Sequence, residues 1–168
     1  PGLVNVYYRR HVIKFTYSKN LMTAAGITSG SVIKKLRIYV TNAVSSSYQP
    51  FPDYSISLKN STSNASVNPG NSGWTQVKGR HKFYATSTGW KEFDISDFTY
   101  TGDTLCFSFS WGQISGGWTQ DGQSYVFNDS GDAYGWATRS DYPDEYYTHS
   151  SSASSSIHSY VPRVDMFF

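Results

Sequence analysis

The feature that most constrains the fold of this chain is an alternation of apolar and polar residues that returns along most of its length. The clearest example is segment 104–111, where Leu105, Phe107, Phe109 and Trp111 alternate with Thr104, Cys106, Ser108 and Ser110. Successive side chains of a β-strand point to opposite faces of a sheet. A spacing of two residues therefore predicts a strand that buries one face.

Four further runs show the same period, and each is bounded by Gly, Pro, Asn, Asp or Ser. The residues expected on buried faces are Ile13, Phe15 and Tyr17, then Val32, Leu36, Ile38 and Val40, then Tyr54, Ile56 and Leu58, and finally Val164, Met166 and Phe168. Weaker strands are expected near WTQVKG, HKFYA, WKEFDI, SYVFN and YGWATR. A total of roughly eight to ten short antiparallel strands predicts an all-β, jelly-roll-like sandwich of two sheets.

One stretch, residues 18–25, has the pattern of a short helix. Ser18 suits the N-cap position, and Leu21 and Met22 suit the buried side. Gly26 suits the C′ position that follows the helix. The sequence has no longer helical pattern, and this argues against an α/β enzyme fold.

The length of 168 residues suits a single domain that spans 1–168. Segment 1–10 precedes the first clear strand, so it either pairs with its own domain or acts as an N-terminal arm that reaches another subunit. Segments 60–73 and 148–159 are rich in small polar residues and are expected to be polar loops.

Charge, hydropathy and cysteine content exclude several classes of function. A net charge of +2, from fourteen basic and twelve acidic residues, gives no electrostatic reason to expect nucleic acid as a partner. No apolar run approaches the ~20 residues of a membrane helix, so no membrane insertion is expected. The single cysteine, Cys106, cannot form an internal disulfide. The abundance of Ser, Thr, Asn, Gly and Tyr favours an extracellular all-β protein.

Three segments resemble the framework pattern of a known group of proteins. They are FTYSKNLMTAAGITSGSVIKKLRIYVTNA (15–43), STGWKEFDI (87–95) and YTGDTLCFSFSWGQ (100–113). Their order is similar to that in jelly-roll-like β-sandwich modules of secreted bacterial adhesin-type proteins and of viral or phage structural proteins, including surface and decoration proteins. The resemblance implies a sandwich that serves adhesion, display or assembly, and it implies no catalytic residue.

No arrangement of residues in the sequence predicts catalysis. The chain has no G-x-S-x-G nucleophile elbow, and its four histidines are scattered. Cys106 is expected to be a buried structural thiol, because free cysteine behaves as a small hydrophobe. Glu92 and Asp94 share one side of a strand, whereas a glycosidase needs two acids that face each other across a cleft. The sequence therefore predicts a protein without enzymatic activity.

One loop offers ligands for a metal ion. Asn128, Asp129 and Asp132 surround a Gly turn and supply the hard oxygens that Ca²⁺ prefers. The segment lacks the full spacing and the distal Glu of a calcium-binding loop. An Asx-rich hairpin turn is therefore favoured over a Ca²⁺ site, and no other cofactor is expected.

Two aromatic and polar segments hold the candidate ligand-binding residues. They are Gln113, Trp118, Gln120 and Asp121 in the first segment, and Arg139, Asp141, Tyr142, Tyr146 and Tyr147 in the second. An exposed indole with amide and carboxylate neighbours suits a sugar ring, and Trp, Tyr and Arg also anchor protein interfaces. Trp111 is expected to lie in the core and Trp136 to plug the sandwich, which leaves Trp118 as the tryptophan expected to touch a partner.

Together these features predict a non-enzymatic structural or adhesive subunit of an extracellular assembly or a virion surface. Its expected partners are further copies of itself, a scaffold or capsid-type protein, or a host surface. The alternative is a carbohydrate-binding module that binds a surface glycan through the exposed aromatic loop residues. Association measured across concentration tests the first hypothesis, and glycan binding by a Trp118→Ala variant tests the second.

Overall fold

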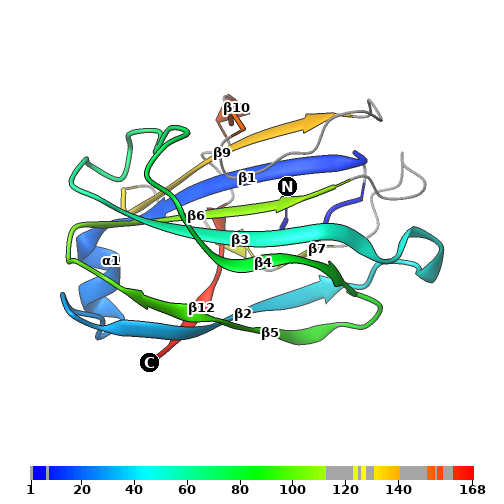
Figure 1. The fold of residues 1–168 in the computed structure, drawn as a ribbon, viewed down its shortest axis with the longest axis horizontal. Helices are drawn as coiled ribbons and strands as arrows, with labels where there is room; N and C mark the ends of the chain where they lie inside the picture. Colours follow the sequence, from blue (N-terminus) through cyan, green and yellow to red (C-terminus); the bar gives the residue numbers. More distant parts are fainter. Residues whose placement is uncertain are drawn as a thin grey trace.

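The protein forms an all-β sandwich of two antiparallel sheets with one short helix at its end (Figure 1). The computed structural model describes residues 2–6, 8–112, 123–124, 126–127, 131–140, 151–153, 155–156 and 161–168. The predicted sandwich is therefore confirmed. Within the described part of the chain, no helix has the length and apolar character needed to span a membrane.

The larger sheet has six strands in the order β10-β9-β1-β6-β3-β4. Their bounds are Ser155–Ser156 (β10), Ala133–Ser140 (β9), Arg10–Tyr17 (β1), Thr104–Trp111 (β6), Phe51–Ser61 (β3) and Thr75–Phe83 (β4). Both neighbours of β1 come from much later in the chain. This sheet is the upper layer of Figure 1.

The smaller sheet is built around β2 (Val32–Asn42), which pairs with β5 (Gly89–Thr99) on one side. On its other side β2 pairs with β12 (Asp165–Phe167) and with β7 (Gln123–Ser124). A separate two-stranded ladder joins β8 (Val126–Phe127) to β11 (Val161–Pro162), and a 3₁₀ turn, η1, spans Ser46–Tyr48.

The hydrophobic core lies between the two sheets, on the faces that the alternation predicted. Phe15 of β1 lies opposite Phe107 of β6, and their rings stack with centroids 4.8 Å apart. Trp111 ends the same row and is fully buried, stacked on Tyr54 at 5.7 Å. Trp111 is therefore a core residue, as predicted.

Two details of the predicted core rows are wrong. Val32 was expected in the core, but the register of β2 against β5 shifts between Ile33 and Lys35, and Ile33 is the buried residue. Between the pairs Ile33–Phe98 and Lys35–Asp94, β5 runs through four residues against two of β2, and the regular alternation of β2 is interrupted at this irregularity. Phe168 was expected beside Val164 and Met166, but it is 54% exposed.

The predicted helix is present as α1, Lys19–Ala24. The Oγ of Ser18 caps it by accepting a hydrogen bond from the amide of Leu21 at 3.2 Å. Met22 is buried, and Leu21 packs against the core from a partly buried position. Gly26 follows with φ +78°, a left-handed conformation that glycine adopts without strain.

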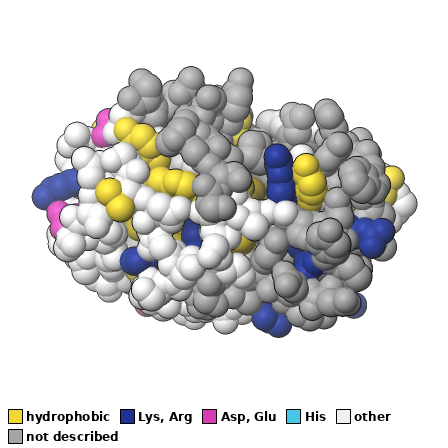
Figure 2. All heavy atoms as spheres, turned by 90° about the horizontal axis from the view of Figure 1, so that it is seen from above, with side chains coloured by type: hydrophobic (Ala, Val, Ile, Leu, Met, Phe, Trp, Pro, Cys, Tyr) yellow, Lys and Arg dark blue, Asp and Glu magenta, His cyan; other side chains and the backbone are white. Residues whose placement is uncertain are grey.

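Residues 62–74, which we call the strap, pack on the outer face of the larger sheet at Lys14 and Thr16 of β1. Lys14 points from β1 into the strap, and its Nζ donates to the carbonyl oxygen of Gly70 at 2.8 Å and to Oδ1 of Asn71 at 2.9 Å. A third hydrogen bond, at 2.7 Å, goes to the carbonyl oxygen of Ser151. Seen from this side in Figure 2, the hydrophobic side chains of the described residues form small patches.

Trp136 is buried on this outer face rather than inside the sandwich. It belongs to a small cluster with Val12 and Ala153 that is separate from the main core. The reason is register, because Trp136 lies opposite Lys14, whose side chain points outward. The expectation that Trp136 plugs the space between the sheets was therefore wrong, although its burial was expected.

Of the two alternatives for the N-terminal segment, the structure has the one in which it packs on its own domain. Leu3, Val4 and Val6 are fully buried in the main core. The amide of Leu3 donates to Oγ of Ser124 at 2.8 Å, and its carbonyl oxygen accepts from the Tyr54 hydroxyl at 3.0 Å.

Candidate binding cleft

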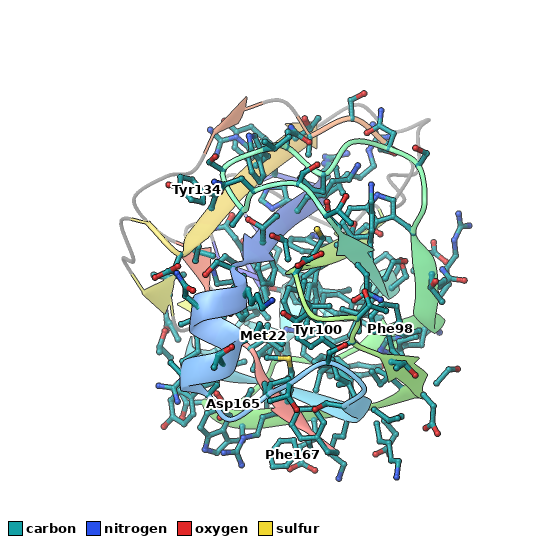
Figure 3. All side chains as sticks on the ribbon, turned by 90° about the vertical axis from the view of Figure 1, so that its left-hand side faces the viewer. Met22, Phe98, Tyr100, Tyr134, Asp165 and Phe167 are labelled. Carbon is teal, nitrogen blue, oxygen red and sulfur yellow. The ribbon has the colours of Figure 1, made fainter. Side chains whose placement is uncertain are left out.

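A cavity of about 400 Å³ opens between α1 and the C-terminal segment at one end of the sandwich. Its walls come from two segments far apart in sequence: Tyr17, Leu21, Met22 and Ala25 on one side, and Arg163, Val164, Asp165 and Met166 on the other. Figure 3 looks onto this end of the molecule and shows Met22 of α1, with Asp165 and Phe167 below it in the view.

A second hollow of about 280 Å³ adjoins the first. The two share Ala25, Val164, Asp165 and Met166, and the second extends along β12 to Phe167. We therefore treat both as one feature, the α1–β12 cleft. Asp165 and Met166 of β12, which ends the order β12-β2-β5 of the described strands, form part of its wall.

Tyr17 holds the two walls of the cleft together. It is the last residue of β1, and its hydroxyl donates to the carbonyl oxygen of Pro162 at 2.7 Å. The same hydroxyl accepts from the amide of Val164 at 3.0 Å. Burial raises the pKa of this phenol well above its usual range, so Tyr17 stays neutral and fixes the C-terminal segment beside the helix.

The mouth of the cleft carries two guanidinium groups and one carboxylate. Oδ2 of Asp165 accepts a hydrogen bond from Nε of Arg37 at 3.1 Å. The same oxygen forms an ion pair with Nη2 of Arg37 at 3.0 Å. Oδ1 of Asp165 accepts from Nε of Arg163 at 3.1 Å. The carboxylate of Asp165 is thus shared between the guanidinium groups of Arg37 and Arg163 at the mouth of the cleft.

Next to the cleft, the outer face of the smaller sheet displays aromatic rings, and we call Arg37, Tyr39, Trp90 and Phe167 the aromatic face. The guanidinium carbon of Arg37 lies 3.9 Å from the ring centroid of Trp90 and 4.8 Å from that of Phe167. Tyr39 meets Trp90 edge-on at 5.1 Å. Trp90 is 43% exposed and Tyr39 is 37% exposed.

Charged side chains continue this face beyond the aromatic residues. Nζ of Lys35 lies 2.9 Å from Glu92 and 3.7 Å from Asp94. Glu92 and Asp94 therefore share one side of β5, as the sequence predicted, and both are engaged with Lys35. They face solvent on a sheet surface rather than each other across a cleft.

Sequence reasoning missed the aromatic face, although a signal was available. Tyr39 lies between Ile38 and Val40, two members of the predicted buried row, so the two-residue period places Tyr39 outward. Trp90 is its partner across the β2–β5 pair. A large aromatic residue at an outward position is the informative observation, because exposed aromatic pairs mark contact surfaces.

Most of the predicted ligand-binding residues lie outside the part of the chain that the structure describes. These are Gln113, Trp118, Gln120, Asp121, Asp141, Tyr142, Tyr146 and Tyr147. Arg139 is described, and it is exposed on β9 with its guanidinium carbon 4.5 Å from the ring centroid of Tyr8. The predicted grouping of Arg139 with its loop neighbours stays a prediction.

Of the predicted metal ligands, Asn128 and Asp129 also lie outside the described residues. The carboxylate of Asp132 accepts a hydrogen bond from Oγ of Ser18 at 2.5 Å, and its carbonyl oxygen accepts from the Ser18 amide at 2.7 Å. Asp132 thus ties the start of β9 to the start of α1. The described ranges contain no group of three or more His, Cys, Asp or Glu residues that could hold a metal ion.

Two reactive residue types are buried on opposite faces of the larger sheet. Cys106 lies opposite Thr16, whose hydroxyl donates to the carbonyl oxygen of Ala65 in the strap, and burial raises the pKa of the thiol to about 12. His11 faces the core beside Trp111 at 4.9 Å. Burial, with a smaller contribution from Arg139, lowers the pKa of His11 to about 3. This geometry keeps the thiol and the imidazole apart and uncharged at neutral pH.

Comparisons with known proteins assign the chain to no family. No family model matches the sequence, and no curated protein matches it.

Proposed function

We propose that this protein is a non-enzymatic, structural or adhesive β-sandwich subunit of an extracellular assembly or a virion surface. The observation that carries the proposal is the aromatic face, an open sheet surface on which Trp90, Tyr39 and Arg37 lie together. Trp, Tyr and Arg are the residues that most often dominate the binding free energy of protein interfaces.

The two outer faces of the sandwich differ in a way that supports this proposal. The strap packs against the outer face of the larger sheet and is held there by Lys14 and Thr16. The aromatic rings of the smaller sheet are exposed instead. A broad surface with exposed aromatic side chains and a charged margin has the composition of an interface core and rim.

The chemistry of the described side chains supports a role without catalysis. A thiol with a pKa of about 12 is not a nucleophile at neutral pH, because the thiolate is the reactive species. A histidine with a pKa of about 3 is a poor general base, since efficient bases titrate near the working pH. Glu92 is ion-paired with Lys35 on an open surface.

Sedimentation velocity across a range of protein concentrations tests the proposal, with a second copy of the chain as the partner. We expect reversible association that Trp90→Ala weakens by about tenfold or more, the effect of losing one interface anchor. The matched control is Tyr84→Ala, which removes another exposed aromatic ring at a position that is 53% exposed. A monomer at every concentration, or equal effects of the two variants, would contradict self-association through the aromatic face.

A second candidate function is carbohydrate binding, and the same exposed rings favour it. The apolar surface of an exposed Trp or Tyr can pack on the C–H groups of a sugar, while nearby carboxylate and ammonium groups bond its hydroxyls. Trp90, Tyr39 and Lys35 combine these groups on one face. A glycan array probed with the wild type and with Trp90→Ala tests this function, and unchanged glycan binding by the variant would rule out the aromatic face as the site.

A further inference from the structure

The strap and the end of β3 contain a residue pattern that the proposed function does not use. Three triplets of the chain match the rule Asn-x-Ser/Thr for acceptors of N-linked oligosaccharides, namely Asn60-Ser61-Thr62, Asn64-Ala65-Ser66 and Asn128-Asp129-Ser130. The rule alone does not distinguish them, because a chain rich in Asn and Ser matches it by chance. The structure describes the first two triplets and gives their acceptor side chains different surroundings.

Asn60 is engaged at both ends of its side-chain amide. Its Nδ2 donates to the carbonyl oxygen of Thr99 at 2.9 Å, and its Oδ1 accepts from the amide of Thr101 at 3.0 Å. The residue belongs to β3 and is half-buried. A sugar on Nδ2 is bulky and would have to enter the space beside the backbone of Thr99. Asn60 is therefore a structural residue that ties β3 to the end of β5.

Asn64 has the opposite surroundings. Its side chain is exposed, and its Nδ2 donates no hydrogen bond within the described residues. Its Oδ1 accepts from the amide of Ser66 at 3.2 Å and from the hydroxyl of Ser66 at 3.4 Å. The side-chain oxygen is thus engaged by the serine of its own triplet, which leaves the nitrogen, the atom that would carry a sugar, as the open end of the amide.

The backbone on either side of Asn64 is fixed to the larger sheet. The hydroxyl of Thr104 donates to the carbonyl oxygen of Ser63 at 2.8 Å, and that of Thr16 donates to the carbonyl oxygen of Ala65 at 2.6 Å. Ala65 is only 2% exposed, so the residue that follows Asn64 is covered while Asn64 is exposed. An oligosaccharide on Asn64 can therefore extend into solvent without displacing either contact.

The aromatic face lies on the other side of the sandwich from Asn64. The strap packs on the outer face of the larger sheet, whereas Tyr39 and Trp90 lie on the outer face of the smaller sheet. An oligosaccharide is bulky and hydrophilic, so it keeps the surface around it out of protein contacts. A modified strap would thus leave the aromatic face free for association.

We propose that Asn64 is the acceptor of an N-linked oligosaccharide on the side of the sandwich opposite the aromatic face. This inference rests on the proposed extracellular role, because the oligosaccharide is attached along the secretory route. In the transfer a C–N bond forms between Nδ2 of Asn64 and the anomeric carbon of the sugar. The bond between that carbon and a polyprenyl pyrophosphate donor breaks, the pyrophosphate leaves with the electron pair, and Nδ2 releases a proton.

Secretion of the whole chain from eukaryotic cells, followed by peptide mass spectrometry, tests the proposal. All forms carry Asn128→Gln, so that only the two described triplets can be modified. We expect the oligosaccharide on Asn64 and an unmodified Asn60. An unmodified Asn64, equal occupancy of the two sites, or a glycan on Asn60 alone would overturn the proposal.

Two matched variants confirm the site without touching either asparagine. Ser66→Ala and Thr62→Ala each remove the hydroxyl of one triplet at an exposed position. Ser66→Ala should lose the glycan, and Thr62→Ala should keep it. The glycosylated protein and Ser66→Ala should also unfold at midpoints that differ by less than about 2 °C. A glycan that lowers the midpoint further would contradict the open surroundings of Asn64.

Sedimentation velocity of the secreted protein tests the placement relative to the aromatic face. The glycosylated protein and Ser66→Ala should associate with equal affinity, and an association about tenfold weaker or more with the glycan would place Asn64 in the interface and refute the placement. Mass spectrometry decides on Asn64 whether or not the protein associates. Failure of this inference and failure of the proposed self-association are therefore distinguishable.

Discussion

His11 provides the sharpest test of how this core is built, because it is an ionisable group placed among aromatic rings. Its side chain is 2% exposed, and its ring centroid lies 4.9 Å from that of Trp111 and 5.9 Å from that of Tyr8. Neither ring nitrogen has a hydrogen-bond partner among the described residues. Charging this ring in place is costly, because a buried charge without a partner loses its hydration and gains nothing in return.

The size of the effect follows from proton binding in the two states. In the folded protein the pKa of His11 is about 3, whereas an unfolded histidine has a pKa of about 6.5. Between these values the unfolded state binds more protons, so the free energy of unfolding falls as the pH falls. At pH 5 the unfolded histidine is about 97% protonated while His11 stays neutral, and the loss relative to pH 7.5 is about 2 kcal/mol.

Urea unfolding of the wild type and of His11→Phe, each at pH 7.5 and pH 5.0, measures this contribution. Phenylalanine keeps an apolar ring at the site and does not titrate, so the stability lost between the two pH values should be about 2 kcal/mol smaller in the variant. His81→Gln, which removes an imidazole from β4, is the control. Equal losses in the wild type and His11→Phe would refute the reasoning, as would an NMR titration of His11 near pH 6.5 in the folded protein.

Three further substitutions test the turn, the cleft and the strap. Gly102→Ala should cost about 1–3 kcal/mol in thermal unfolding, because φ is +101° and a Cβ would lie 2.8 Å from the side chain of Ser29, whereas Gly79→Ala, with no neighbouring atom within 4 Å, should cost none. Tyr17→Phe should cost about 1–3 kcal/mol in urea, because it leaves a buried amide and a carbonyl oxygen without their hydroxyl partner. Lys14→Met removes three hydrogen bonds to the strap and its neighbour, so thermolysin should cleave within residues 62–74 several-fold faster than in the wild type.

The alternation of residues was enough to predict the sandwich, because it reports directly which side chains a strand buries. In β3 the row Tyr54, Ile56 and Leu58 is fully buried as expected. Prediction failed where the backbone departs from a regular strand. The register shift after Ile33 is not visible in a sequence of consecutive Val, Ile and Lys residues, since either apolar residue satisfies the pattern.

The cleft was beyond sequence reasoning for a different reason. The helix was predicted with Leu21 and Met22 on its apolar side, but the opposing wall comes from Val164 and Met166, about 140 residues later. Long-range contacts bring these segments together, namely the pairing of β12 with β2 and the hydrogen bonds of Tyr17 to Pro162 and Val164. Local periodicity contains no information about which distant segment covers an apolar side, so the helix was predictable and its binding cleft was not.

The central position of the earliest strands has a consequence for synthesis on the ribosome. β1 lies between β6 and β9, and β2 lies between β5 and β12, so neither sheet can close until its late strands have left the exit tunnel. Until β6 has been synthesised, β1 has no partner strand on either edge, and the edge that pairs with β9 stays open for longer, a condition that favours aggregation. Folding of both sheets is therefore expected to be completed only after the last strands have been synthesised, and slowing translation after β6 should not by itself yield a folded intermediate.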